Sequence, residues 1–208
     1  MAMNHIRWGA VVGASCFLFF AAWLAGMPRG GAKLFRVSTN AMAARDDAAS
    51  VAAFKEMLVV IRNPRCMNCH SNGDFPRQGD DGHAHAMNVR RGPDGKGVTA
   101  EKCNTCHQDH NLEGLHLPPG APNWHLPPRD MPMIWQGLTD RGICEQLKDP
   151  ARNGHRSMEQ LVEHFTTDKL VAWGWNPGPG RAAVPMSREE FAAKVKAWAS
   201  KGAACPTD

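Results

Sequence analysis

Two copies of the pattern Cys-x-x-Cys-His constrain this chain more than any other feature. The first copy is CMNCH at residues 66–70, and the second is CNTCH, which begins 37 residues after the first, at Cys103. A cysteine pair with this spacing can bind zinc, carry out thiol chemistry or attach haem. The rest of the sequence has to decide among these three chemistries.

The histidine that follows each cysteine pair favours haem. The two pairs are separated by 33 residues, more than the roughly 15 to 20 residues of a zinc ribbon. A thioredoxin-like site needs one pair between a strand and a helix, and does not explain a second copy. Covalent haem uses both cysteines and takes the adjacent histidine as its proximal iron ligand. We therefore predict two covalently attached c-type haems. The attachment residues are Cys66, Cys69, Cys103 and Cys106, and the proximal iron ligands are His70 and His107.

An uncharged apolar run covers residues 8–27 and follows Arg7. A basic residue before such a run is typical of an export signal, and about 20 apolar residues can also span a bilayer. We therefore predict that residues 1–32 form a signal peptide or an N-terminal membrane anchor. Residues 33–208 would then form one dihaem domain in the periplasm. An uncleaved N-terminal segment would anchor this domain to the inner membrane. Export agrees with haem, because a bare cysteine pair tends to oxidise outside the cytoplasm.

Composition favours a mainly α, loop-rich fold. The chain has 208 residues, with 20 Gly, 15 Pro and no Tyr, which suits one domain with many loops and little sheet. The net charge of +4 is spread along the chain, and this excludes a strongly basic nucleic-acid-binding protein. We predict a small multihaem c-type cytochrome whose two covalent haems lie close together in one fold.

Helices are predicted on both sides of an irregular middle segment. Apolar spacing indicates helices at 46–61 and 134–148, and two helical pieces within 157–173, broken near Thr166 and restarted at Asp168. A last helix at 188–201 opens with a capping box from Ser187 to Glu190. A short helix should hold the second motif. Residues 72–97 should be irregular and residues 117–132 extended, because both segments are rich in Gly or Pro.

Histidines crowd into the segment that follows the first motif, and they are candidates for the distal iron ligands. We favour His85, which lies among small residues, and His125, which lies in a Pro-rich segment. His110 is three residues after His107 and should stay on the proximal side of a helical turn. Alternatives that stay open are His83, His116, His110, Met131 and Met133. A methionine ligand would raise the potential of its haem. His155 and His164 are predicted to lie on the surface.

Cys144 and Cys205 are left over after the two motifs and the cysteine of the export segment are counted. In an oxidising compartment we predict a disulfide between them, which would pin the last helix to the middle of the chain. The alternative is two unpaired buried thiols.

Four tryptophans lie near the predicted haem segments, namely Trp124, Trp135, Trp173 and Trp175. We expect them to pack in the core. Packing on the haem faces and a partner-docking surface remain the alternatives.

Electron transfer is the predicted function. Two haems with histidine on both sides of the iron have no open coordination position, so they pass electrons and do not bind a small substrate. The chain is then a non-catalytic electron carrier or the electron-transfer subunit of an oxidoreductase. The alternative is a small dihaem enzyme, such as a peroxidase or a sulfur-compound oxidoreductase, with one open haem site. No residue set typical of another catalytic chemistry is present, and we predict no catalytic residues.

Several short runs give the chain a family resemblance. PRCMNCH, GDDGHAH, CNTCHQDHN, PPGAPNWHLPP, MPMIWQGL, WGWNPG and GAACP together resemble the cytochrome subunit of bacterial isoquinoline 1-oxidoreductase, over most of residues 54–206. The resemblance implies a periplasmic molybdenum hydroxylase as partner, with electrons passing on to the respiratory chain. A looser likeness to the dihaem small subunit of periplasmic nitrate reductase does not extend to the distal ligands, because that family uses a histidine before its first motif.

Overall fold

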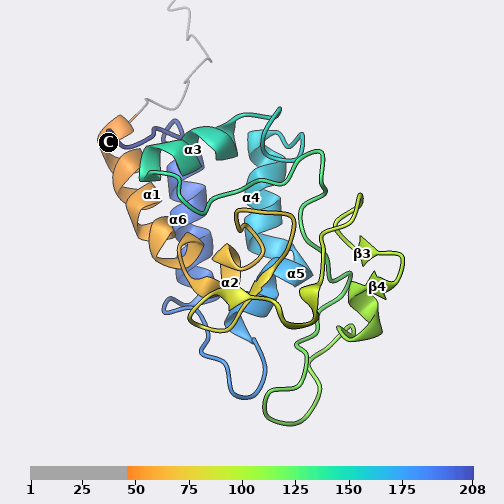
Figure 1. Ribbon diagram of the computed structural model, residues 1–208. Coiled ribbons are helices and arrows are strands. Elements are labelled where there is room, and N and C mark those ends of the chain that lie inside the picture. Colours follow the sequence, from red (N-terminus) through yellow and green to blue (C-terminus); the bar gives the residue numbers. More distant parts are fainter. Residues whose placement is uncertain (1–45) are drawn as a thin grey trace, which may run out of the picture. The chain divides into compact units, whose positions relative to one another are not determined.

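Three helices enclose the hydrophobic core. The computed structural model describes residues 46–208, in which α1 (Asp47–Ile61) and α6 (Arg188–Ser200) lie side by side (Figure 1). On its other side, α6 packs against α4 (Met158–Thr167). The apolar stripe of α6, formed by Phe191, Val195 and Trp198, is buried there. The rings of Phe54 and Trp198 meet between α1 and α6, with centroids 5.4 Å apart.

Side-chain caps explain where these helices begin. The carboxylate of Asp46 accepts a hydrogen bond from the Ala49 backbone N–H (3.0 Å) at the start of α1. Complete capping boxes open α4 at Ser157 and α6 at Ser187. Each cap satisfies backbone donors that would otherwise lack partners. The predicted helix at 46–61 and the predicted box from Ser187 to Glu190 are confirmed.

The break predicted within 157–173 is also confirmed. α4 ends at Thr167, and Asp168 caps the next helix, α5 (Lys169–Ala172), by accepting from the backbone N–H groups of Leu170 and Val171. A 3₁₀ turn, η3 (Trp173–Trp175), follows directly. This places a carboxylate at the junction of two helices.

The helix predicted at 134–148 is shorter than expected. α3 (Asp140–Lys148) begins only after its cap at Thr139. Before it, the backbone N–H groups of Trp135 and Gln136 both donate to the carbonyl of His70 (2.9 and 3.2 Å), and Gly137 has a φ of +85°. These long-range hydrogen bonds replace the local helical ones, and the apolar spacing could not reveal them.

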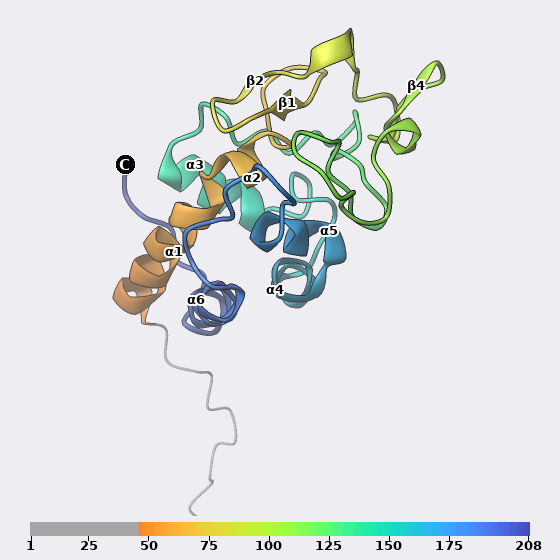
Figure 2. The same ribbon diagram turned by 90° about the horizontal axis from the view of Figure 1, so that it is seen from below.

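Residues 62–134 are largely loop, and they lie on one side of α1, α4 and α6 (Figure 2). They contain α2 (Pro64–Met67), two short antiparallel hairpins and two 3₁₀ turns, η1 (Ala86–Asn88) and η2 (Cys103–Thr105). The hairpins pair β1 (Arg77–Gln78) with β2 (His83–Ala84), and β3 (Gly97–Val98) with β4 (Glu101–Lys102). The fold is therefore mainly helical and loop-rich, as predicted.

A disulfide closes the helical side of the molecule. Cys144 in α3 is bonded to Cys205, with the two Cα atoms 5.6 Å apart. Beneath it, the indole N–H of Trp198 donates to the carbonyl of Ala204 (3.1 Å), and the hydroxyl of Ser50 accepts from the Ala204 N–H (2.9 Å). The predicted disulfide is confirmed.

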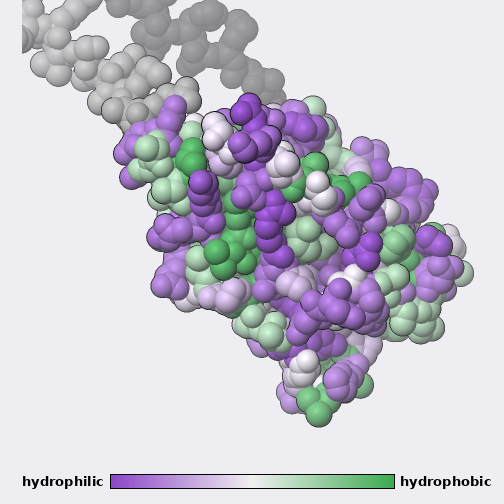
Figure 3. Space-filling view, turned by 60° about the vertical axis from the view of Figure 1, so that its left-hand side comes forward, coloured by the Kyte–Doolittle hydropathy of each residue, from purple (hydrophilic) through white to green (hydrophobic). Residues whose placement is uncertain are grey.

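The prediction of a transmembrane protein is corrected. Within residues 46–208, none of the helices has the length and apolar character needed to cross a membrane. The predicted signal peptide or anchor at 1–32, with its apolar run at 8–27, lies outside the described residues. The face of the molecule on the α1 side is mostly hydrophilic, and hydrophobic residues form only small separate areas on it (Figure 3).

Candidate functional site

The first motif forms one helical turn directly after α1. The side chain of Asn63 caps α2 by accepting from the Arg65 N–H (2.9 Å), and Pro64 occupies the first turn. The backbone N–H groups of Cys69 and His70 both donate to the Cys66 carbonyl (3.2 Å each). Both cysteines and His70 thereby line one cavity of about 310 Å³ between the helices and the loops. That volume is within the range of small-molecule and cofactor sites.

The imidazole of His70 is held on two sides. Its Nδ1–H donates to the carbonyl of Met133 (2.8 Å), and its ring stacks on Trp135, with centroids 3.6 Å apart and planes 7° apart. Burial lowers the pKa of His70 to about 4, so the ring is neutral at pH 7. Within residues 46–208, Nε2 has no hydrogen-bond partner. A neutral imidazole whose Nδ1–H is bound to a carbonyl is the form that ligates a metal through Nε2.

The second motif repeats this arrangement on a different scaffold. The N–H groups of Cys106 and His107 donate to the Cys103 carbonyl (3.2 and 2.9 Å). The Nδ1–H of His107 donates to the carbonyl of Pro119 (2.7 Å), and its ring stacks on Trp124, with centroids 4.4 Å apart and planes 5° apart. Burial lowers the pKa of His107 as well. Each motif histidine thus has a carbonyl partner, a tryptophan stack and an unengaged Nε2.

The four motif cysteines are free thiols, whereas Cys144 and Cys205 are disulfide-bonded. Burial raises the pKa of Cys66 to about 12 and that of Cys69 to about 11. These thiols are therefore neutral near pH 7 and are not arranged as reactive thiolates. The two pairs do not form the disulfides that a thiol-redox site would use.

The two motifs are neighbours in space. Trp124 stacks on His107 of the second motif and lines the cavity of the first motif. Arg91 is 1% exposed and ties the intervening loops together, because it donates to the carbonyls of Pro127 (2.7 Å) and Gly73 (3.2 Å). Hydrogen bonds from the buried Arg91 guanidinium therefore hold these loops together, in a region with very few strand hydrogen bonds.

His85 is the predicted distal residue that lies beside a motif histidine. Its ring centroid is 6.1 Å from that of His107, with the planes 62° apart. Its Nδ1–H donates to the Ala86 carbonyl (2.7 Å), so its Nε2 is also unengaged within the described chain. Two metal–nitrogen bonds of about 2 Å, with about 1 Å from each nitrogen to its ring centre, give a centroid spacing of about 6 Å. The centroid spacing of the pair therefore agrees with that of two imidazoles on one metal ion.

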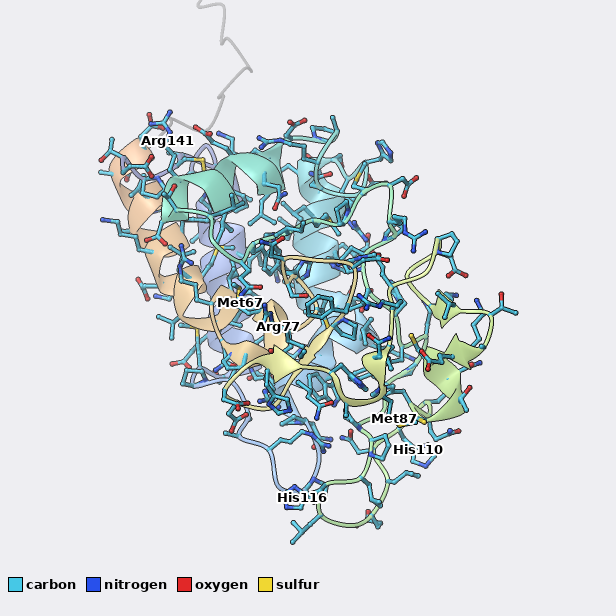
Figure 4. The ribbon with its side chains drawn as sticks, viewed as in Figure 1. Met67, Arg77, Met87, His110, His116 and Arg141 are labelled. Carbon is cyan, nitrogen blue, oxygen red and sulfur yellow. A yellow bond between two sulfur atoms is a disulfide. The ribbon has the colours of Figure 1, made fainter. Side chains whose placement is uncertain are left out.

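Three other predicted histidines are not placed this way. His83 is exposed and pairs with Asp81 (2.6 Å). His110 and His116 lie on the outer loops, far from Met67 in the first motif (Figure 4), and both are exposed. None of the three lines the cavity of the first motif.

The remaining candidates do line that cavity. They are His125, Met131 and Met133. The Nδ1–H of His125 donates to the Asn123 carbonyl (2.5 Å), the sulfur of Met131 accepts from the Gly154 N–H (2.7 Å), and Met133 supplies the carbonyl that holds His70.

Two histidines that we expected on the surface also line the cavity. These are His155 and His164. His155 is exposed, but the side chain of His164 is only 26% exposed, so the prediction is wrong for His164. A signal for it exists in the sequence, because His164 follows the buried Leu161 by three residues and precedes the buried Phe165. That spacing places it near the inner face of α4.

The prediction of core packing is confirmed for Trp135, whereas Trp124, Trp173 and Trp175 are only half-buried. Trp135 is 4% exposed and belongs to the core, yet it also stacks on His70. Trp124 stacks on His107 and meets Trp173 edge-on, with centroids 5.1 Å apart. Trp124, Trp135 and Trp173 all line the cavity of the first motif.

No protein-family model, curated protein or solved structure matches this chain.

The prediction of metal binding is corrected for protein side chains acting alone. Within the described part of the chain, no group of three or more His, Cys, Asp or Glu side chains could hold a metal ion.

Proposed function

We propose that this chain is an exported dihaem c-type cytochrome that transfers electrons. The observation that carries the proposal is the repeated environment of His70 and His107. In each motif an imidazole donates Nδ1–H to a backbone carbonyl, stacks on a tryptophan and leaves Nε2 unengaged. A carbonyl that accepts from Nδ1–H in this way orients a histidine toward a metal and fixes its tautomer.

The residues around the first motif fit a haem. Cys66 and Cys69 are free and face the cavity together with His70. Arg65 Nε and Trp135 Nε1 are buried without hydrogen-bond partners in residues 46–208, and both residues line the same cavity. Unpartnered buried donors are costly, and the carboxylates of a bound haem would supply acceptors of the kind that they lack. When bound, the haem iron supplies a one-electron couple between its ferric and ferrous forms.

The chain's own residues would hold each haem and shield it. Cys66 and Cys69 would attach the first haem, and Cys103 and Cys106 the second. His70 and His107 would ligate the irons, and His85, whose ring lies beside that of His107, would supply a second ligand to the same iron. Trp124 and Trp135 keep water from the motif histidines and fix their ring planes. A histidine on both sides of an iron leaves no position for a small substrate, which favours a carrier over an enzyme.

Exported localisation and the partner are part of the proposal. The Cys144–Cys205 disulfide supports an oxidising compartment such as the periplasm. The resemblance to an isoquinoline 1-oxidoreductase subunit supports a molybdenum hydroxylase as the electron donor, with the respiratory chain as the acceptor. No feature of the described surface calls for a nucleic acid.

The test is haem stoichiometry after export in a bacterium that matures c-type cytochromes. Intact mass after denaturation and solvent extraction should give two covalent haems per chain. The absorption spectrum of the native protein should be low-spin in both redox states. C66A/C69A and C103A/C106A should each retain one haem. A protein without covalent haem would refute the proposal, and a high-spin ferric haem in the wild type would favour a small dihaem enzyme.

A further inference from the structure

His164 occupies a distinctive place in the first cavity. It projects from α4, whose packing against α6 makes it one of the firmly held elements of the fold. Its side chain lines the same cavity as both cysteines of the first motif and His70. A ligand on a packed helix is held more firmly than one on a loop.

Asp168 fixes the orientation of the His164 ring. One carboxylate oxygen of Asp168 lies 3.3 Å from His164 Nδ1. The other oxygen accepts hydrogen bonds from the N–H groups of Leu170 (2.8 Å) and Val171 (3.1 Å). The carboxylate is therefore locked at the start of α5 and engages only one side of the imidazole. This leaves His164 Nε2 without a hydrogen-bond partner in the described chain.

His164 shares the cavity of His70, and the Nδ1 of each ring is engaged, that of His70 by the Met133 carbonyl (2.8 Å) and that of His164 by Asp168 (3.3 Å). At the second motif, His85 lies beside His107 with ring centroids 6.1 Å apart, and its Nδ1 is engaged by the Ala86 carbonyl (2.7 Å). Each motif histidine is thus accompanied by a second histidine whose Nδ1 is already engaged.

We propose that His164 is the distal iron ligand of the haem attached at the first motif, opposite His70, and that Asp168 is its positioning residue. The assignment rests on the proposed function. It replaces His125, which we favoured from the sequence. His125 lies in a loop next to Trp124, which stacks on the histidine of the second motif, whereas His164 lies on a packed helix. His125 and the cavity methionines remain outcomes of the test.

The experiment compares single substitutions in the dihaem holoprotein. The test variants are His164→Ala and His164→Met, and the matched controls are His155→Ala and His125→Ala, which change histidines lining the same cavity. His164→Ala should convert one of the two haems to high spin, seen by absorption and electron paramagnetic resonance, and added imidazole should restore low spin. His164→Met should keep both haems low-spin and raise one reduction potential. Both controls should leave the spectra unchanged.

Asp168→Asn provides a test that preserves folding, because asparagine can still cap α5. Loss of the carboxylate should weaken donation by His164 and shift the potential of one haem upward, with both haems still low-spin. Unchanged low-spin spectra in His164→Ala, or loss of a ligand in His125→Ala, would overturn the ligand assignment alone. A wild-type protein without two covalent haems would overturn the proposed function and the assignment with it.

Discussion

The two Cys-x-x-Cys-His motifs place their histidines in matching environments but draw on different parts of the fold. The first motif continues from α1 and faces a cavity lined by α4, α5 and η3. The second follows the β3–β4 hairpin and lies in loops, and its Cys106 is exposed. The stacked tryptophan of the first motif is a core residue, whereas that of the second is only half-buried.

This difference teaches how one local site can be supported in two ways. Around the first motif, apolar burial supplies most of the stability, since Trp135 joins the same cluster as Phe54 and Trp198. Around the second, order comes from hydrogen bonds between loops. Examples are the Leu126 N–H donating to Gly95 (2.9 Å) and Gly120 donating to the amide oxygen of Asn111 (3.0 Å). We therefore expect the first site to tolerate changes less well than the second.

The largest expected effect comes from removing one cysteine pair. C66A/C69A should lose the first haem and accumulate poorly, because the emptied cavity lies against the core. C103A/C106A should lose the second haem but keep a folded helical scaffold. Soluble yield, haem content and far-ultraviolet circular dichroism measure the contrast. Equal yields of the two variants would break the comparison.

The stacked tryptophans should show the same asymmetry on a smaller scale. Trp135→Ala should lower the free energy of unfolding by about 3–5 kcal/mol, the usual cost of removing a large buried side chain. Trp124→Ala should cost about 1–2 kcal/mol, since that ring is only half-buried and mainly loses its stacking and edge contacts. Chemical denaturation of both holoproteins would give the values. A larger loss for Trp124→Ala would mean that the second site, too, belongs to the core.

Local patterns in the sequence predicted the helices well. Asp46, Ser187 and Asp168 marked helix starts that the structure confirms, because a cap and its helix lie within a few residues of each other. The helix predicted at 134–148 was wrong for its first six residues, for the opposite reason. Its first residues bond to His70, more than 60 positions away, and periodicity contains no information about such partners.

The candidate site was predictable only in part for the same reason. The motif residues follow from spacing, and the disulfide from the leftover cysteines. His85 lies beside His107 as favoured, but nothing local distinguishes His85 from the exposed His83. His164 was misplaced on the surface although its spacing from Leu161 indicated the inner face of α4. That α4 lines the cavity of the first motif is a long-range arrangement that the sequence does not show.

Loss of the Cys144–Cys205 disulfide should destabilise mainly the helical core around the first motif. The bond spans 61 residues, and closing a loop of that length contributes about 4 kcal/mol at most by the chain-entropy account. C144A/C205A should therefore unfold at a denaturant concentration lower by the equivalent of about 2–4 kcal/mol. The second haem's spectrum should be unaffected at low denaturant. Parallel changes in both haem spectra would show that the two regions unfold as one.

Glycine substitutions test the packing of the loops around the second motif. Gly95 has a φ of +77°, and a methyl group there would overlap the Leu126 carbonyl oxygen. Gly95→Ala should cost about 2–3 kcal/mol and disturb the second haem's spectrum first. Gly137 has a similar φ of +85° but open space around it, so Gly137→Ala is the matched control at about 1 kcal/mol. Equal costs would mean that backbone strain alone, without the loop contact, accounts for the effect.

The smallest expected effect is a difference in reduction potential between the two haems. A ferric haem with two neutral ligands has one more positive charge than its ferrous form, so burial and nearby cations disfavour the ferric state. At the first motif, burial is joined by the charges of Arg91 and Arg156, which both lower the pKa of His70. The first haem should therefore have the higher potential.

A difference of about 60 mV corresponds to about 1.4 kcal/mol for one electron, and a spectroelectrochemical titration resolves it. C103A/C106A, which would keep only the first haem, identifies the higher of the two potentials. Arg156→Gln should then lower that potential while leaving the second unchanged, because Arg156 lines the cavity of the first motif. If the single haem of C103A/C106A titrated at the lower potential instead, burial and nearby cations would not explain the difference between the two reduction potentials.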